Sequence, residues 1–373
     1  MVSFTPSAER LALTDSAARM LRERYADHQQ QHFEAARWRE FAALGWLAAC
    51  VDEQHGGVAL AWSTASALCE ALAPAVAPEP LAAQLALVGH VLNQARPGAA
   101  RDDALEAWLA GEHLLALAHG EDDSPPWLSE QVQTRCTRDA DGYVLNGHKR
   151  QVLDAALASQ LLVTARDTSG ALAVFVLARD MPGLTLSLRD SIDGRSHADV
   201  RLTAVRVDTA MRLEFARDTV EVLAQSAWLH ALLQSAEALG LLAAMLRASH
   251  EYLVQRQQFG QALIEFQALQ HRLVDMLLTL SRLESLLEVA RCQCDAHGPV
   301  AAAPYIAAVK AACGEEGRAL ARQAVQLHGA IGVTAELALA AQMRRLMALE
   351  MLGGSTAQHA DYWMSTLDNA AHV

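Results

Sequence analysis

The sequence predicts a mainly helical α+β protein, in which a small β domain separates an N-terminal helical domain from a C-terminal four-helix bundle. Apolar residues recur at helical spacing before residue 115 and after residue 212. Between these points, short β-branched and aliphatic runs alternate with turn dipeptides. The chain has 373 residues, too many for one typical domain, so we expect three domains with the boundaries 1–114, 115–212 and 213–373.

The first domain is predicted to be helical. The segment "SAARMLRERYADHQQQHFEAARWREFAAL" (16–44) alternates polar and apolar faces at helical spacing. The turn "VDEQHGGVAL" (51–60) interrupts this pattern at Gly56 and Gly57, where glycine permits backbone conformations closed to other residues.

The middle domain is predicted to be a small β-barrel. Asp141-Gly142 and Asn146-Gly147 flank "YVL", and dipeptides of this kind are strong hairpin signals. The runs "LLVTAR", "LAVFVLAR" and "LTLSLR" follow, with no intervening helix long enough for a parallel βαβ unit. A glycine-rich fingerprint between a first strand and a helix is missing, which argues against a Rossmann dinucleotide site.

The last domain is predicted to be an up-and-down bundle of four long helices, over about 218–259, 264–297, 301–330 and 336–352. In the second of these, apolar residues keep a spacing of three or four and form one stripe for the bundle core. The stripe consists of Leu269, Leu273, Met276, Leu280 and Leu283.

Composition excludes several classes of protein. A net charge of −13 makes nucleic acid an unexpected partner, because phosphate binding needs clustered Lys and Arg. The first twenty residues lack a signal-peptide pattern, and no uninterrupted apolar run reaches membrane-spanning length, so we expect a cytoplasmic protein that does not enter a membrane. No CxxC pair occurs, and we expect reduced thiols and no metal site. The cysteines are Cys50, Cys69, Cys136, Cys292, Cys294 and Cys313.

Four segments carry a resemblance to a known family. The segment "RQQFGQALIEFQALQHRLVDM" (256–276) resembles a signature of Arg, Phe-Gly, Ile-x-x-Phe-Gln-x-x-Gln and a final Asp-Met. "QLHGAIG" (326–332) resembles a second signature, Gln-x-x-Gly-Gly-x-Gly. "LGWLAACVDEQHGG" (44–57) and "GYVLNGHK" (142–149) resemble its N-terminal and β-domain motifs. In this order they resemble the acyl-CoA dehydrogenase family, whose fold has the same three-part layout.

The resemblance implies an activity and a shared cofactor. The family oxidises the α–β bond of an acyl-CoA thioester; a Glu removes the α proton, FAD accepts the β hydride, and electron-transfer flavoprotein is the usual acceptor. The FAD lies across a subunit interface. Residues of the two signatures are therefore implied to reach a neighbouring chain's FAD, with Ala330 standing where the family has its second Gly. They are Arg256, Phe259, Gln326, Gly329 and Ala330.

These residue types suit that role physically. An arginine fork matches a pyrophosphate, and a Phe ring packs on an adenine or flavin edge. Gln supplies an amide, while Gly and Ala let the backbone approach closely.

The catalytic Glu of the family is missing. Its position in the loop "LGGST" (352–356) falls on Gly353, which cannot take a proton. Some family members carry the base on the first long bundle helix, and the matching position here is near His230. Glu237, in "SAEALG", is a second candidate for a shifted base. For both residues, a packed polar contact of the bundle is the more common role at such a position.

Side chains that cover the flavin in the family are also replaced. Where the family reads Trp-Ile-Thr-Asn, this sequence has Gln151, Val152, Leu153 and Asp154. The family's Thr-Glu-Pro segment is represented only by "AHGEDDSPP" (118–126).

One hypothesis accounts for both the kept and the lost residues. The chain would be a subunit without its own base that completes the FAD site of a second acyl-CoA dehydrogenase-type subunit in an α2β2 heterotetramer. Relatives of this kind act in bacterial steroid side-chain degradation. Two alternatives remain open: an active homo-oligomeric dehydrogenase with a non-standard base, and a flavin-free scaffold or binding subunit.

Overall fold

A computed structural model describes residues 5–25, 32–121 and 131–371, and its contacts group the chain into two compact units. Unit 1 comprises Met1–His32, Ala61–Pro78 and Ala231–Val373. Unit 2 comprises Phe33–Leu60 and Glu79–His230. The first predicted domain thus contributes helices to both units, and the three predicted boundaries stay a prediction.

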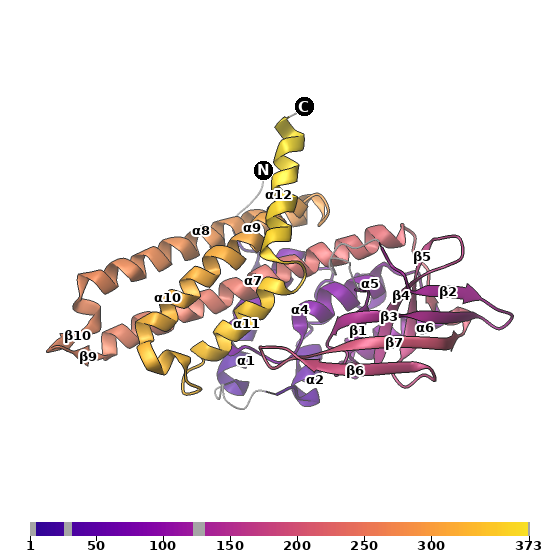
Figure 1. The fold of residues 1–373 in the computed structure, drawn as a ribbon, viewed down its shortest axis with the longest axis horizontal. Coiled ribbons are helices and arrows are strands. Elements are labelled where there is room, and N and C mark those ends of the chain that lie inside the picture. The colour runs from indigo at the N-terminus through magenta and orange to yellow at the C-terminus, as the bar shows by residue number, and fades with distance from the viewer. Residues whose placement is uncertain (1–4, 26–31, 122–130, 372–373) are drawn as a thin grey trace. The chain divides into compact units, whose positions relative to one another are not determined.

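Unit 1 is helical, and the predicted long helices of the bundle are confirmed (Figure 1). The third predicted helix is a continuous run in which a π-helical turn, Cys313–Gly317, joins α9 to α10. A further helix, α12, was not predicted. The helices are α1 (Ala8–Arg24), α3 (Trp62–Leu72), the later part of α7 (Thr219–Gln255), α8 (Gln267–His297), α9 (Ala303–Ala312), α10 (Arg318–His328), α11 (Leu339–Met351) and α12 (Thr356–Ala371).

The apolar stripe of α8 faces the core of unit 1 as predicted. Leu273, Met276, Leu280 and Leu283 are buried, whereas Leu269 at the start of the helix is only half-buried. Burying such side chains stabilises a helix far more than its intrinsic propensity does.

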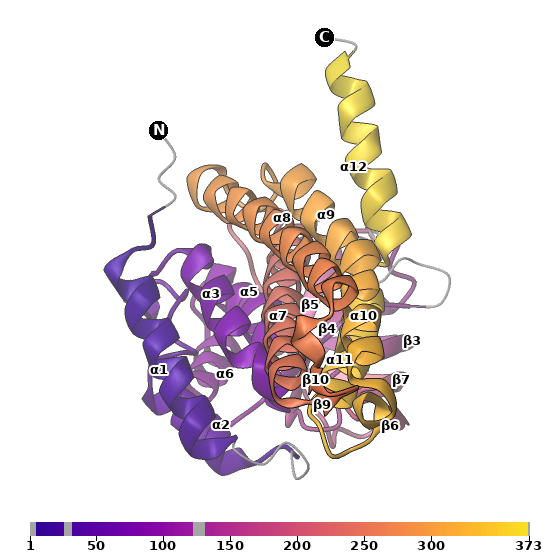
Figure 2. The same cartoon turned by 90° about the vertical axis from the view of Figure 1, so that its left-hand side faces the viewer.

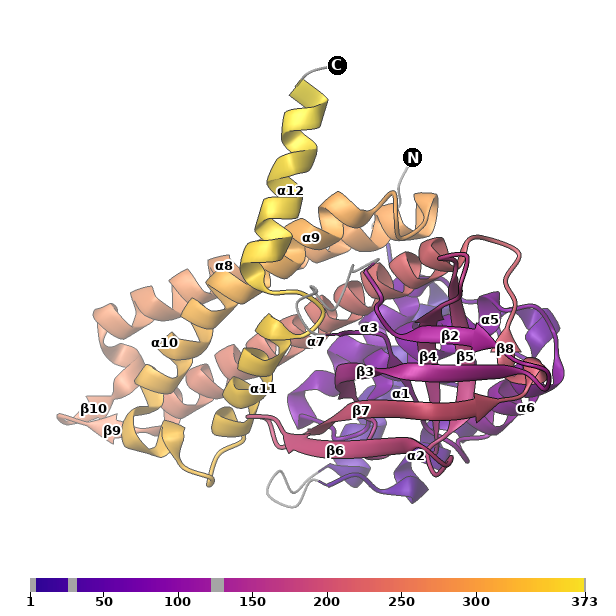
Figure 3. The same ribbon diagram turned by 45° about the vertical axis from the view of Figure 1, so that its right-hand side comes forward.

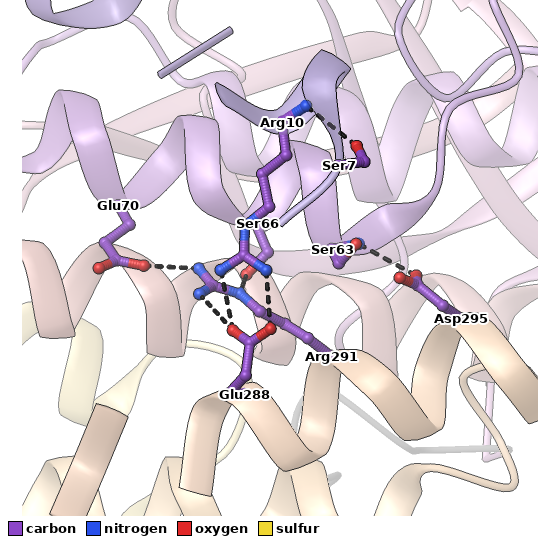
Figure 4. Close-up of polar contacts among 8 residues, drawn as sticks. All are labelled: Ser7, Arg10, Ser63, Ser66, Glu70, Glu288, Arg291 and Asp295. Carbon is purple, nitrogen blue, oxygen red and sulfur yellow. Dashed lines mark hydrogen bonds and ion pairs between the residues drawn. The ribbon is translucent and has the colours of Figure 1, made fainter. Parts of the chain in front are cut away.

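A buried arginine joins three helices of unit 1 (Figure 4). Arg291 on α8 is 3% exposed and donates to Ser66 Oγ at 3.0 Å and to Glu70 Oε2 at 2.6 Å, both on α3. It also donates to Glu288 Oε2 at 3.3 Å, and Glu288 accepts two bonds from Arg10 of α1 at 2.7 and 2.8 Å. Because each charge has a partner, the network holds α1 and α3 on α8 without leaving a buried charge unpaired.

We expect Arg291→Ala to lower the free energy of unfolding by about 3 kcal/mol, because it removes the arginine that Glu70, Glu288 and Ser66 share. Urea denaturation followed by circular dichroism measures this loss. The matched control is Arg272→Ala, an exposed arginine of the same helix, which we expect to change stability by less than about 0.5 kcal/mol. Equal effects of the two substitutions would contradict a structural role for the network.

Unit 2 contains the predicted β domain, whose described residues form a sheet of eight strands, and the first part of α7. Its other described α-helices are α2 (Ala35–Ala43), α4 (Leu81–Ala83), α5 (His90–Gln94) and α6 (Ala99–Leu109). A π-helical segment, Gln84–Gly89, joins α4 to α5. The strands are β1 (Leu115–Ala118), β2 (Arg135–Arg138), β3 (Tyr143–Leu153), β4 (Gln160–Arg166), β5 (Leu172–Ala178), β6 (Leu184–Asp190), β7 (Ser196–Val207) and β8 (Arg212–Leu213).

The strand order is β6-β7-β3-β2-β4-β5-β8, with β1 paired to β4 (Figure 3). All pairs are antiparallel except β1–β4 and β2–β4. Fully buried aliphatic and aromatic side chains such as Leu145, Phe175 and Val200 form the core of the sheet. Antiparallel pairing of short strands agrees with the absence of long helices between them.

One of the two predicted hairpin turns is wrong. Asp141-Gly142 does connect β2 to β3, but Asn146-Gly147 lies inside β3, at a register shift between Leu145 and Gly147. A Cβ at Gly147 would lie 2.2 Å from Thr134 Oγ1, so this glycine permits a close approach rather than a turn.

The remaining expectations concern membrane and thiols. Among the described residues, α7 alone has the length and apolar composition of a membrane-spanning helix, but 89% of its most apolar window is buried in the protein. It therefore behaves as a core helix. All six cysteines are free, and Cys69, Cys136, Cys294 and Cys313 are buried.

Candidate functional site

The first signature ends in an exposed hairpin, β9 (Gln257–Gln258) and β10 (Gln261–Ala262). Its two loop residues, Phe259 and Gly260, have φ values of 57° and 84°, the left-handed pair of a tight two-residue turn. This conformation is strained for Phe, and its ring is 90% exposed, touching only the edge of Phe266 with centroids 6.1 Å apart. The hairpin presents an aromatic ring that unit 1 does not bury.

Arg256 stands at the base of this hairpin, directly after α7. Its backbone is fixed, because its N–H donates to Tyr252 O and its carbonyl accepts from Leu263 N, both at 2.8 Å. Its guanidinium is exposed and makes no hydrogen bond or ion pair with any residue that the structure describes. All its side-chain donors are therefore available to a ligand or another chain.

The second signature lies at the same end of unit 1 (Figures 1 and 2). Gln326, Gly329 and Ala330 are exposed, and Gly329 ends α10 with φ of 65° and open space where a Cβ would lie. The ring of Tyr252 stacks on His328 with centroids 4.6 Å apart, so α7 and α10 hold the two signatures together.

The structure thus brings all five predicted cofactor-binding residues to one exposed end of unit 1. A fork of donors, an aromatic ring, an amide and a thin backbone suit the phosphates and rings of a dinucleotide. They form an open half-site, which we call the dinucleotide edge: Arg256, Phe259, Gln326, Gly329 and Ala330.

The loop at the family's base position joins α11 to α12. Gly353 and Gly354 both have left-handed φ values, 67° and 98°. His359 Nε2 lies 2.8 Å from Gly353 O, and Lys310 Nζ donates to Leu349 O at 2.5 Å. The carbonyl can only accept, so Nε2 carries the proton of a neutral imidazole. Two buried side chains from α12 and α9 therefore hold the backbone on both sides of the loop.

Burial dominates the titration of both side chains. It lowers the pKa of His359 to about 4, opposed by the bond to Gly353 and assisted by Lys310. It lowers the pKa of Lys310 to about 8. At neutral pH the imidazole is neutral and the amine is charged, which fits their two hydrogen bonds.

The pKa of His359 predicts a pH dependence of stability. Because the folded-state pKa lies below the unfolded value of about 6.5, the unfolded chain binds more protons between these pH values. The stabilisation is complete above pH of about 6.5, and about 3 kcal/mol of it is lost as pH falls to about 4. His359→Gln keeps a donor and removes the titration, so its unfolding free energy should fall less over this window. Parallel profiles for variant and wild type in urea denaturation would refute this.

Neither candidate for a shifted base is placed in an open site. Glu237 is bound by both ends of a fork, since Arg345 Nε and Nη2 donate to its two oxygens at 2.6 and 2.9 Å. His230, at the end of the unit 2 part of α7, is buried with 5% exposure. Glu350, three residues before Gly353, accepts from Arg318 at 2.9 Å. The catalytic roles of His230 and Glu237 stay a prediction.

The segment that replaces the family's flavin-covering residues forms a bulge. The pairing of β3 with β7 shifts register between Lys149 and Val152, and Gln151 is exposed with φ of 51°. Val152 and Asp154 are buried. In this stretch neither an aromatic ring nor a hydroxyl is available to a flavin. Of "AHGEDDSPP", residues 122–126 lie outside the described residues.

Sequence reasoning missed a buried ion pair in this domain. Lys149 is fully buried and donates to Glu121 at 2.6 Å and to Thr164 Oγ1 at 3.0 Å. Burial lowers the pKa of Lys149 to about 8, and burial raises the pKa of Glu121 but is outweighed by Lys149 and Thr134. A signal was present: Lys149 and Lys310 are the chain's only lysines, and both are buried.

Among the residues that the structure describes, no group of three or more His, Cys, Asp or Glu is placed to hold an ion.

Comparison with known proteins agrees with this fold and these motifs. Residues 7–112 match the acyl-CoA dehydrogenase N-terminal domain, and residues 208–364 match the acyl-CoA dehydrogenase C-terminal domain. The chain belongs to the acyl-CoA dehydrogenase family.

Two relatives align along most of their length. Benzylmalonyl-CoA dehydrogenase of Aromatoleum aromaticum is 28% identical over 318 residues, covering 80% of this chain and 82% of that protein. Acyl-CoA dehydrogenase FadE27 of Mycobacterium tuberculosis is 28% identical over 364 residues, covering 93% and 92%.

Solved structures share the fold at low identity. PigA with FAD and proline has a TM-score of 0.88 at 23% identity. The ChsE4–ChsE5 complex from Mycobacterium tuberculosis has a TM-score of 0.85 at 22% identity. Each comparison covers 98% of this chain and 99% of the other. At these identities the likeness shows the fold alone.

Proposed function

We propose that this chain is a subunit of an FAD-dependent acyl-CoA dehydrogenase, that it lacks a catalytic Glu of its own, and that it completes the FAD site of a partner subunit in an α2β2 heterotetramer. The observation that carries the proposal is a division within the chain. The five residues of the dinucleotide edge are exposed in their own unit, whereas Gly353 stands at the base position in the loop.

When bound, FAD supplies the acceptor for the β hydride in the desaturation of the acyl thioester. The residues of this chain bind and orient. Arg256 would donate to the pyrophosphate, and Phe259 would pack on a ring of the dinucleotide. Gln326 would add a hydrogen bond, while Gly329 and Ala330 would let the backbone come close.

The replaced residues of the middle domain favour an FAD held by a partner chain over an FAD held by this chain alone. Gln151 and Leu153 stand where the family has a covering Trp and a hydroxyl donor. The Lys149–Glu121 pair satisfies the buried charge of Lys149 within this domain. The chain keeps the family residues that would contact a neighbouring chain's FAD, but not those that would cover an FAD of its own. This combination fits a subunit that completes the site of a partner.

A partner chain also accounts for apolar surface on unit 1. In Figures 1 to 3, α12 extends away from the other helices of unit 1 and packs against α9. Trp363, Met364 and Leu367 of α12 are 38%, 51% and 46% exposed. Exposed aromatic and aliphatic groups of this kind are typical of protein interfaces.

The remaining assignments follow the family. The substrate would be an acyl-CoA, the acceptor electron-transfer flavoprotein and the location the cytoplasm. The likeness of the fold to the ChsE4–ChsE5 complex supports a heteromeric arrangement. A role in steroid side-chain degradation is proposed on the same analogy.

The colour of the purified protein tests the proposal. Expressed alone, the chain should lack the visible absorbance of oxidised flavin; co-expressed with a base-carrying family member, it should yield a yellow heterotetramer by light scattering. A yellow homo-oligomer that an acyl-CoA bleaches anaerobically would overturn the proposal in favour of an active enzyme with a non-standard base. A colourless assembly with every partner would favour the scaffold alternative.

Arg256→Ala tests the dinucleotide edge. Removing charge-assisted hydrogen bonds worth about 1.5–3 kcal/mol should weaken FAD retention in the co-expressed complex about ten- to a hundredfold. Flavin absorbance after gel filtration and titration of the apo-complex measure the effect. The matched control is Arg247→Ala, an exposed arginine earlier on α7, which should retain wild-type flavin content. Unchanged flavin content in Arg256→Ala would remove this residue from the site.

A further inference from the structure

Position 353 is closed to side chains for two independent reasons. Its φ of 67° lies in the left-handed region, which strains any residue with a Cβ. A Cβ built on Gly353 would also lie 2.5 Å from Gln234 Oε1 and 3.3 Å from its Cδ. The first distance is shorter than any ordinary contact, so something must move before a side chain fits.

Gln234 is well held in this place. It lies on α7 with 1% exposure, and its Oε1 is buried without a hydrogen-bond partner among the described residues. Leaving a buried amide oxygen unpaired costs free energy, so this glutamine is not explained by stability alone. The oxygen instead lies 2.5 Å from the place where a Cβ of residue 353 would stand, so with Gln234 in this position only glycine fits.

The backbone of the loop has little freedom to relieve the clash. His359 fixes the carbonyl of Gly353 itself, and Lys310 fixes the carbonyl of Leu349 one turn earlier. The amide of Gln234 is the end of a flexible side chain, but moving it would displace packed neighbours because it has almost no exposed surface.

We propose that Gln234 and Gly353 form a matched pair that excludes any side chain, and with it a base, from the position of the family's Glu. At the base position the loop has a glycine in place of an acid, and the amide of Gln234 on α7 occupies the space that a side chain would need. A single Gly353→Glu substitution would therefore not restore the acid; the amide of Gln234 must be shortened as well. The interpretation of position 353 as the family's base position rests on the proposed function, but the steric contact between Gln234 and Gly353 does not.

A double-mutant cycle on the purified full-length chain tests the pairing. We expect Gly353→Ala to lower Tm at least twice as much as Gly298→Ala, the matched control, whose glycine has φ of 83° and open space around its Cβ. In the Gln234→Ala background, the Tm loss caused by Gly353→Ala should shrink to that of the control. Such non-additivity is the mark of residues in direct contact.

Gln234→Met separates length from polarity. It keeps a side chain of similar length without the amide, so Gly353→Ala should remain as damaging in this background as in the wild type. A smaller loss in Gln234→Met than in Gln234→Ala would overturn the steric account.

Equal Tm losses from Gly353→Ala in the wild-type and Gln234→Ala backgrounds would overturn the proposal. If Gly353→Ala and Gln234→Ala/Gly353→Ala both fail to fold, shortening Gln234 gives no rescue, and the proposal is overturned as well. A Gly353→Ala chain that fails to fold, with a Gln234→Ala/Gly353→Ala chain that folds, would support it. These readouts need neither flavin nor partner. A yellow, active homo-oligomer would sink the proposed function and leave the pairing to be judged by Tm alone.

Discussion

The loop between α11 and α12 depends on the hydrogen bond from His359 Nε2 to the carbonyl of Gly353. Because the acceptor is a backbone oxygen, this bond uses no side-chain atom of position 353. The bond from Lys310 to Leu349 O has the same property. The two hydrogen bonds therefore hold the turn without needing an acid in the loop.

Elsewhere in the chain, too, buried polar contacts that hold the fold differ from residues at the family's cofactor positions. Buried charges are retained where they join elements: Arg345 with Glu237 in unit 1, and Lys149 with Glu121 in unit 2. Losing one partner of such a pair would leave an unpaired buried charge, which is costly. Gln151, which stands at a position where the family has a flavin-covering residue, carries no such penalty because it is exposed. Physical constraint thus differs sharply between buried charges that join elements and an exposed side chain such as Gln151.

Much of the fold was predictable from local pattern, because helical periodicity and short β runs depend on neighbours in sequence. The site was predictable only where a family motif supplied residues, as for Arg256 and Phe259. Contacts between distant segments were not: no local pattern pairs Gln234 with Gly353 or Lys149 with Glu121. The Asn146-Gly147 dipeptide misled for the same reason, since its glycine permits a close approach to Thr134, which lies just before β2.

Phe259 gives the strongest argument for a partner. An exposed Phe with positive φ is unfavourable twice over, because its ring stays in water and its backbone is strained. Among the described residues of unit 1, an edge contact with Phe266 is the one ring contact that the Phe259 side chain makes. The tight turn is nevertheless formed, next to an arginine with no partner among the described residues. Burial of the ring against a dinucleotide and a second chain would recover the cost of its exposure, and would use the free donors of Arg256 at the same time.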